Sequence, residues 1–404
     1  MIRVLMFGWE FPPYKSGGLG TACYGLTKGL AKQKTKVTFI MPFAPKKAKA
    51  KFVKLIGTGD ISQNVKVRAI KSALSPYLTS TTYEYKINKT KRGWAKQVYG
   101  KDLFEEVERY TSAAGKIAKE EPHDVIHAHD WMTYKAGILA KKASKKPLIV
   151  HLHATEFDRT GGNPDHRIAH AEWEGLKAAD KIITNSNFSK ENIIRHYKIK
   201  PEKIEVVHWG IHDEKAHSLE EEKAPGKTVL FLGRVTIQKG PDHFLKAAKK
   251  VLEYEPETNF ILAGSGDMLE RCIRLSAELG ISDKVVFTGM LRGDDVHRAF
   301  KRADLFVMPS VAEPFGLVAL EALKNGTPVI VSKQSGVQEV LNHALKVDFW
   351  DIDEMANKIV SVLRYDTLRE ELRENGVREV ALEKFTLDAP ARKVRRIYEQ
   401  IANN

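Results

Sequence analysis

Cysteine is scarce in this chain: its 404 residues contain only Cys23 and Cys272, which lie far apart in the sequence. Two distant cysteines argue against a disulfide framework and favour a reducing, cytoplasmic compartment. No apolar run approaches the roughly 18 residues that a membrane-spanning helix needs. The apolar run that starts at Arg3 meets Glu10 and two prolines without a small-residue cleavage site, so we expect no signal peptide.

Basic residues are in excess, 65 against 51 acidic ones, and the resulting net charge of +14 favours anionic partners. Part of the excess is local, because five lysines and no acid occur between Ala44 and Gly59. We interpret this lysine-rich segment as a solvated loop, with peripheral contact to a membrane surface as the alternative. Nothing near it resembles a nucleic-acid-binding motif, so we expect no nucleic acid partner.

Short apolar runs rich in β-branched residues alternate with helical patterns, which is typical of parallel sheets covered on both faces. The expected strands are Arg3–Gly8, Val37–Met41, Val125–Ala128, Leu148–Leu152, Lys181–Thr184, Ile204–His208, Thr228–Gly233, Asn259–Ala263, Val285–Thr288, Leu305–Met308 and Pro328–Val331. A polar stretch, His212–Lys227, interrupts the alternation and ends in Pro-Gly, as linkers do. We predict an α/β protein with two doubly wound Rossmann-like domains, 1–212 and 213–385, facing across a cleft, and a final helix in 386–404.

A glycine-rich segment, Lys15–Gly20 (KSGGLG), follows the first expected strand and precedes a helix. Glycine lets the backbone approach a phosphate closely, and a helix N-terminus adds free amide donors. Lys15 adds a positive charge, and Gly17 and Gly18 are the expected points of close approach. The segment is neither a Walker loop nor a dinucleotide GxGxxG motif, and a plain turn is the alternative.

Two histidine-containing segments follow expected strands of the first domain. In Ile126–Trp131 (IHAHDW), we expect His127 and His129 to point to opposite faces, one toward the cleft and the other into the core. In HLHATEFDR, His153 and Glu156 are candidates for hydrogen bonds to the hydroxyl groups of a polar substrate. A loop network that only orients its neighbours is the alternative. No convergent third ligand lies nearby in the sequence, so we expect no metal site.

The second domain opens with FLGRVTIQKG, which places Arg234 and Lys239 in one loop just before an expected helix. Arginine offers a two-pronged donor and lysine a compact charge. Two cations and two glycines in one loop favour binding of a diphosphate.

A further segment, SVAEPFGLVALEALKNGTPVI, carries Glu313 and Glu321 on either side of a glycine. If a helix starts near Gly316, the amides of Phe315, Gly316 and Leu317 lack acceptors in that helix and favour an anion. Eight helical residues span ~12 Å. This length suits a nucleotide sugar, with a carboxylate for hydroxyl groups at each end and the diphosphate between them. A hydrolytic acid–base pair is the alternative, but it leaves Arg234 and Lys239 unexplained.

Together these motifs resemble the retaining glycosyltransferases of the GT-B fold, in the large family that contains bacterial and archaeal glycogen synthases. The likeness covers essentially the whole chain. The motifs that carry it are KSGGLG at Lys15–Gly20, HAHDW at His127–Trp131, GRV..QKG from Arg234 to Gly240, and the E-x7-E pair Glu313 and Glu321.

The resemblance implies that the second domain, 213–385, binds the nucleotide-sugar donor and that the first domain, 1–212, lies on the acceptor side. Arg234 and Lys239 would neutralise the diphosphate, Glu321 would hold the ribose, and Glu313 and His129 would lie at the transferred sugar. Lys15 and Gly18 would close over the phosphates from the first domain, and the final helix would cross back onto that domain. We therefore assign catalytic roles to His129, Arg234, Lys239 and Glu313.

The activity implied is retaining transfer of glucose from ADP- or UDP-glucose to an α-1,4-glucan, as in glycogen synthases, without a metal, a cofactor or a protein nucleophile. A lipid, a cell-envelope saccharide or a small metabolite is the alternative acceptor. A protein that only binds sugar or nucleotide is a different class, which would not need paired cations to stabilise a leaving diphosphate. The oligomeric state stays open.

Overall fold

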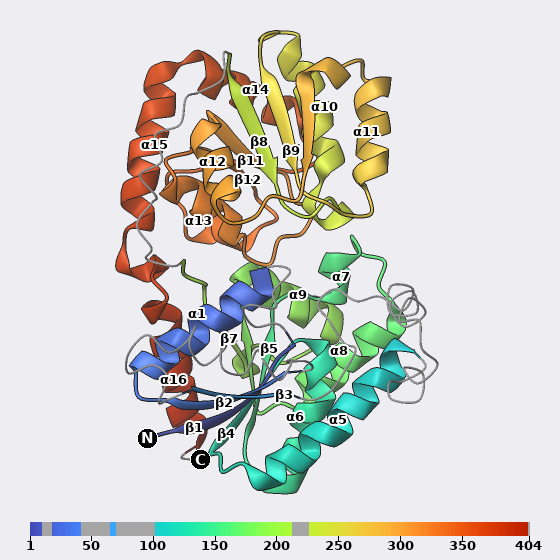
Figure 1. The fold of residues 1–404 in the computed structure, drawn as a ribbon, viewed down its shortest axis with the longest axis vertical. Helices are drawn as coiled ribbons and strands as arrows, with labels where there is room; N and C mark the ends of the chain where they lie inside the picture. Colours follow the sequence, from blue (N-terminus) through green and yellow to red (C-terminus); the bar gives the residue numbers. More distant parts are fainter. Residues whose placement is uncertain (10–17, 42–64, 70–101, 212–225, 403–404) are drawn as a thin grey trace.

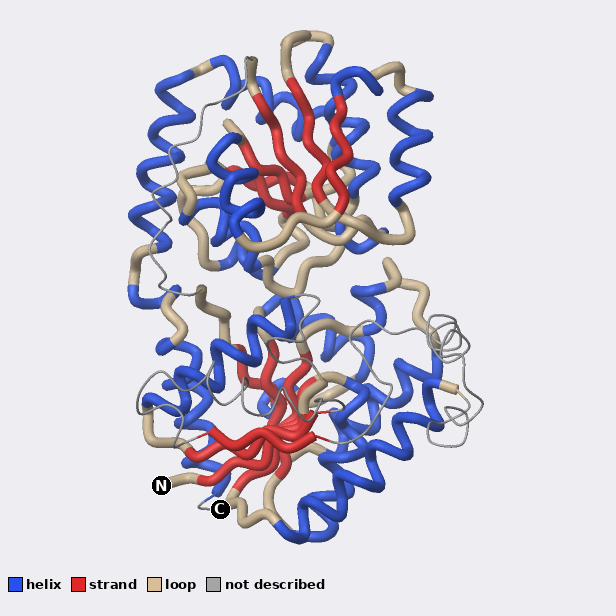
Figure 2. The backbone as a smooth tube through the Cα atoms, viewed as in Figure 1, coloured by secondary structure: helices blue, strands red, loops and turns tan. Residues whose placement is uncertain are grey.

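The computed structural model describes residues 1–9, 18–41, 65–69, 102–211 and 226–402 of the chain. These residues form two lobes, each built around one parallel sheet with helices on both faces (Figures 1 and 2). The predicted fold class, two doubly wound Rossmann-like domains, is confirmed. The predicted domain boundary at 212/213 lies at residues outside the description.

The first sheet has seven strands in the order β3-β2-β1-β4-β5-β6-β7. Its strands are β1 (Arg3–Phe7), β2 (Lys36–Met41), β3 (Val65–Ala69), β4 (Val125–His129), β5 (Leu148–Leu152), β6 (Lys181–Thr184) and β7 (Ile204–Val206). The helices around it are α1 (Gly18–Lys32), α5 (Leu103–Glu120), α6 (Trp131–Ser144), α7 (Glu156–Arg159), α8 (His166–Ala178) and α9 (Asn187–Tyr197), with the 3₁₀ turn η2 (Pro201–Lys203).

The second sheet has six strands in the order β10-β9-β8-β11-β12-β13. They are β8 (Thr228–Leu232), β9 (Asn259–Ala263), β10 (Val285–Gly289), β11 (Leu305–Met308), β12 (Val329–Ser332) and β13 (Leu345–Val347). The helices around it are α10 (Pro241–Leu252), α11 (Leu269–Glu278), α12 (Asp294–Arg302), α13 (Leu317–Lys324), α14 (Ile352–Arg364) and α15 (Asp366–Val380), and α16 (Asp388–Ala402) follows them in the chain. The 3₁₀ turns are η3 (Ile237–Lys239), η4 (Ser282–Lys284), η5 (Gly336–Glu339) and η6 (Glu383–Phe385).

The central strands are buried along their whole length, because helices cover both faces of each sheet. This burial explains why they appear in the sequence as continuous apolar runs. β4 and β5 depart from that pattern, since β4 carries two histidines and β5 carries one, all buried as completely as the neighbouring valines and isoleucines. Polar rings inside an apolar sheet need hydrogen-bond partners, which singles out this part of the core.

The loops after the strands of the two sheets meet at the domain boundary. The hydroxyl group of Ser186 in the first domain donates to the carbonyl of Pro314 in the second, at 2.6 Å. The carboxylate of Glu339 accepts from the first-turn amides of α9, Asn187 N–H at 2.9 Å and Phe188 N–H at 2.7 Å. His208 lies 3.1 Å from the same carboxylate. Burial alone would raise the pKa of Glu339, but these hydrogen bonds outweigh it and lower that pKa.

The last helix, α16, packs on α1 of the first domain (Figure 1). Glycine in α1 makes the close approach possible: a Cβ at Gly29 would lie 2.6 Å from the Cβ of Ala391 and 2.8 Å from the carbonyl oxygen of Leu387. From α16, the buried Tyr398 hydroxyl reaches Nδ1 of His127 on β4, at 2.6 Å. The end of the chain is thus part of the first domain's core.

Neither described cysteine forms a disulfide, and both are buried. Among the residues that the structure describes, no helix is long and apolar enough to cross a membrane.

We predict that Tyr398→Phe lowers the free energy of unfolding by about 1–3 kcal/mol, because it leaves a buried imidazole nitrogen without its partner. The ring and its packing stay, so the change isolates the hydrogen bond. Chemical denaturation monitored by circular dichroism measures the effect, and Tyr365→Phe, at an exposed tyrosine, is the matched control. Equal stability of the two variants would contradict this role for Tyr398.

Candidate active site

Two loops of the second domain, one after β8 and one after β11, interlock at the carboxyl edge of its sheet. The guanidinium of Arg234 donates to Oε1 of Gln238 at 2.9 Å, and the carbonyl of Gln238 accepts from Val311 N–H at 2.9 Å. The two loops also pack closely at Gly240. This residue has a φ of 63°, and a Cβ on it would lie 2.2 Å from the carbonyl oxygen of Pro309. Only glycine fits there.

The interlocked loops bring together two of the predicted catalytic residues. Nζ of Lys239 forms an ion pair with Oε2 of Glu313, and the hydroxyl of Ser310 lies 3.4 Å from the same oxygen. The two side chains are only 19% and 9% exposed, so the pair is screened less by solvent than a surface pair. Lys239 and Glu313 therefore work as one unit rather than as separate charges.

The segment after Glu313 turns sharply into α13. Gly316 has a φ of 107°, and a Cβ there would lie 2.9 Å from Cε of Met308. Phe315 is buried, and its carbonyl accepts from Val337 N–H at 2.6 Å. The helix begins at Leu317, one residue after the predicted start, so its first-turn amides lack acceptors within α13. Glu321 lies one turn further along, on the same side of the helix as Leu317.

In the first domain, the expectation that His127 and His129 point to opposite faces is wrong. Side chains two positions apart on a strand share a face, and the two rings lie 4.2 Å apart between centroids. β5 adds His151, and His153 follows just beyond its end, so four imidazoles form one stacked group that we call the histidine column. The ring of Trp209 stacks on His151 at 5.3 Å.

Hydrogen bonds define which atoms of the histidine column are occupied. Nδ1 of His129 lies 2.9 Å from Nε2 of His153, and Nε2 of His151 lies 3.2 Å from Oδ1 of Asn185. The amide of His153 donates to Oδ1 of Asp130 at 2.9 Å. Within the described part of the chain, three nitrogens of the column are buried and have no hydrogen-bond partner: Nε2 of His127, Nε2 of His129 and Nδ1 of His151. Each of them could therefore accept or donate a hydrogen bond to a ligand.

Burial lowers the pKa of each histidine in the column, and neighbouring imidazoles lower those of His127, His129 and His153 further. For His151 the pKa falls to about 3. The rings are therefore neutral at pH 7. One proton lies between His129 Nδ1 and His153 Nε2, so His153 determines whether His129 Nε2 donates or accepts.

Glu156, a predicted acceptor-binding residue, lies in a buried charged network. Its carboxylate accepts from Nε of Arg159 at 3.1 Å, and Arg159 also pairs with the fully buried Glu172. The amide of Glu156 donates to Glu172 at 2.9 Å. This network fixes α7, which contacts η3, the turn that ends at Lys239. The carboxylate of Glu156 thus already has a partner in Arg159. Acceptor binding by Glu156 stays a prediction.

The remaining predicted residues lie partly outside the description. Lys15 and Gly17 are outside the described residues, as is the lysine-rich segment Ala44–Gly59, and Gly18 is the first residue of α1. Tyr398, Asn185 and Gln238 were not predicted as site residues. The roles of Tyr398 and Asn185 come from contacts between distant segments, and Gln238 joins Arg234 to the loop after β11.

Two groups in this region have the composition of a metal site. Cys23, His129 and His153 place ligand atoms within 4.8 Å of one another, and so do His127, His129 and His151. The 2.9 Å between His129 Nδ1 and His153 Nε2 is a hydrogen-bond distance. Two nitrogens on one tetrahedral zinc ion, each about 2.0–2.1 Å from it, lie about 3.4 Å apart. The absence of a metal requirement stays a prediction.

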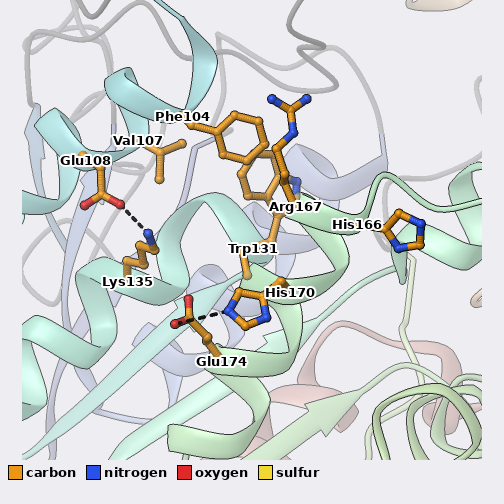
Figure 3. A pocket seen from close by; sticks show the side chains of 10 residues that line it. Phe104, Val107, Glu108, Trp131, Lys135, His166, Arg167, His170 and Glu174 are labelled. Carbon is orange, nitrogen blue, oxygen red and sulfur yellow. Dashed lines mark hydrogen bonds and ion pairs between the residues drawn. The ribbon is translucent and has the colours of Figure 1, made fainter.

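A hollow of about 490 Å³ lies on the first domain, between α5, α6 and α8 (Figure 3). Its aromatic residues are Phe104 and Trp131, and Arg167 lies over the Phe104 ring at 4.5 Å. Lys135 pairs with Glu108, and His170 lies 3.7 Å from Glu174. The charged side chains that line the hollow are thus largely paired.

Comparison with known proteins follows the division into two domains. A family profile described as "Glycosyltransferase Family 4" matches residues 16–215, and one described as "Glycosyl transferases group 1" matches residues 213–379. An uncharacterized glycosyltransferase of Methanocaldococcus jannaschii is 30% identical over 420 residues, covering 98% of both chains. A D-inositol 3-phosphate glycosyltransferase of Mycobacterium sp. (strain JLS) is 32% identical over 278 residues, 62% of each chain.

Solved structures share the fold at low sequence identity. Sucrose-phosphate synthase from Thermosynechococcus elongatus has a TM-score of 0.74 at 20% identity, covering 99% of both chains. HepE from Anabaena, solved in complex with UDP and glucose, has a TM-score of 0.69 at 17% identity, covering 99% of this chain and 100% of HepE. At such identities the likeness shows the architecture alone.

We predict that acid destabilises this protein through the histidine column. The unfolded chain gains a proton at each imidazole below a pKa of about 6.5, whereas the folded column stays neutral. Stability is therefore full above pH 6.5 and falls below it, by about 1.4 kcal/mol per histidine and pH unit. Unfolding free energies measured between pH 7.5 and 5 test this.

The slope of the unfolding free energy against pH, compared between wild type and a histidine variant, distinguishes the column from other titrating groups. His151→Gln is expected to reduce the slope by the equivalent of one proton, because burial lowers the pKa of this imidazole in the folded state. The same slope in the wild type and in His151→Gln would contradict the prediction.

Proposed function

Because the chain belongs to the glycosyltransferases that combine family 4 and group 1 domains, we propose that it transfers glucose from ADP- or UDP-glucose, with retention, to an α-1,4-glucan. The assignment of a nucleotide-sugar donor rests on one observation: Arg234, Lys239 and Glu313 lie in the two joined loops that follow β8 and β11. Cations and helix amides at the carboxyl edge of a parallel sheet suit a diphosphate.

In the proposed complex, Arg234 and Lys239 bind the diphosphate, and the first-turn amides of α13 add donors. Lys239 then lies between two anions, the phosphate and Glu313. Glu313 thereby fixes the position of the lysine and presents its other oxygen to the sugar hydroxyls, while Glu321 accepts from the ribose. These groups stabilise the negative charge that develops on the leaving nucleoside diphosphate.

His129 supplies the first domain's contact with the transferred sugar. Its Nε2 is buried and unpartnered among the described residues, and a neutral imidazole does not compete with the cations for the phosphate. In the proposed step, the bond from the anomeric carbon to the phosphate oxygen breaks and the acceptor oxygen bonds to that carbon on the same face. The acceptor's proton passes to the departing phosphate, so no protein nucleophile is required.

A phosphorylated small acceptor is the second candidate, and the relatives favour it. One is called a D-inositol 3-phosphate glycosyltransferase, and a structural neighbour is a sucrose-phosphate synthase. Both names contain a phosphorylated polyol or sugar. The donor site is common to both candidates, so only the product distinguishes them.

Incubation with radiolabelled ADP-, UDP- or GDP-glucose and a set of acceptors tests the proposal. Glycogen, inositol phosphate, fructose phosphate and a lipid extract form the set. We expect glucose in glycogen, released by α-1,4-specific hydrolysis, and the same yield in excess chelator. Transfer to another acceptor alone would overturn the glucan assignment, and loss of transfer in chelator would overturn metal independence.

We predict that Lys239→Met lowers kcat about 10²- to 10³-fold, because a donor aimed at the developing charge is lost. Lys250→Met is the control, since this lysine is on the next helix and pairs with the exposed Asp353. Melting temperatures of both variants establish that the fold is intact. Full turnover in Lys239→Met would contradict the assigned role.

A further inference from the structure

The loop between β13 and α14 presents a tryptophan to solvent. Trp350 is 59% exposed, and it follows β13 by three residues. Isolated exposed hydrophobic residues are common on proteins and carry no message alone. The position of Trp350 is informative, because strand ends at the carboxyl edge of a parallel sheet are where ligands bind.

Hydrogen bonds connect this loop to the donor site. The carbonyl of Gln334 accepts from Glu313 N–H at 2.9 Å, and Nε2 of Gln334 donates to Oδ1 of Asp348 at 2.9 Å. A contact between two rings is the second connection. Phe349 packs on His243 in the first turn of α10, with ring centroids 5.1 Å apart. That helix starts directly after Lys239 and Gly240.

The loop is held rigidly although its tryptophan is exposed. Lys333 donates to Asp348 at 2.8 Å, and Asp351 caps α14 by accepting from Glu354 N–H at 3.0 Å. The ring of Phe349 stands nearly perpendicular to that of Trp350, at 84° and 4.8 Å between centroids. A rigid aromatic side chain loses little entropy on binding, so it makes an effective contact surface.

The surroundings of Trp350 favour a sugar over a protein or a lipid. A hexose ring has an apolar C–H face and a rim of hydroxyl groups. The loop carries one indole, Asp348 and Asp351 lie within two positions of it in the sequence, and Lys333 binds Asp348. A protein or membrane contact needs a larger continuous apolar patch than a single ring.

We propose that Trp350 stacks on a sugar unit of the acceptor, at a distance from the unit that reacts. β12 separates β11 from β13, so the loops that carry Glu313 and Trp350 lie about two strand spacings, or ~10 Å, apart. This distance is comparable with a short run of linked hexoses. The inference rests on the proposed function and narrows it, because a subsite so placed suits an oligo- or polysaccharide and not a single phosphorylated polyol.

Binding measured without transfer tests the subsite. Titration calorimetry of the full chain with maltoheptaose, and with a mannose oligomer of equal length, is expected to detect binding of at least one. Trp350→Ala is expected to weaken that binding about tenfold and Trp350→Phe less, with UDP and ADP binding unchanged. Tyr254→Ala, at another exposed aromatic residue of the second domain, is the matched control.

No binding of either oligosaccharide to the wild type, or equal affinity in Trp350→Ala, would overturn the subsite. Transfer assays separate this result from the proposed function. If Trp350→Ala synthesises glucan with the same acceptor KM as the wild type, the subsite is contradicted and the proposed function stands. If oligosaccharide binding depends on Trp350 but no glucose is transferred to glucan, the subsite is supported and the proposed glucan synthase activity is contradicted.

Discussion

The arrangement of the two domains depends on one carboxylate. Glu339, at the end of η5, occupies the N-terminus of α9 in the other domain, where the first-turn amides need an acceptor and the helix dipole favours a negative charge. The second domain thus supplies the hydrogen-bond acceptor for amide groups of α9 that have none among the described residues of the first domain. With Ser186 on Pro314, this contact turns the two carboxyl edges toward each other, and the loops after β8, β11, β4 and β5 lie on the facing sides as a result.

The two sides of the candidate site solve different electrostatic problems. The second domain keeps full charges, Lys239 against Glu313, in a pair that is mostly but not completely buried. The first domain places four imidazoles so deep that their neutral forms prevail. Among the residues that the structure describes, the cations of the candidate site therefore belong to the second domain, and the histidine column can contact a neutral sugar without attracting the phosphates. This asymmetry orients a nucleotide sugar before any hydroxyl contact is made.

Much of this arrangement could be predicted from the sequence, because parallel strands buried on both faces leave continuous apolar runs such as Leu148–Leu152. The loop residues Lys239 and Glu313 were also predictable, since they directly follow such runs. Contacts between distant segments were not, and the hydrogen bond between His127 and Tyr398 joins residues 271 positions apart. The facing of His127 and His129 was predictable from strand geometry, but the prediction assigned them opposite faces, and the period of two residues puts them on one.

The packing of α16 on α1 has a consequence for how the chain is made. During synthesis the first domain leaves the ribosome before the second exists, and domains of most chains begin to fold in that order. Here the hydroxyl partner of His127 and the surface that covers Gly29 reside in the last helix. Part of the core of the nascent first domain therefore stays uncovered until α16 has been synthesised. Emergence of α16, rather than emergence of the first domain, completes the hydrogen bond at His127.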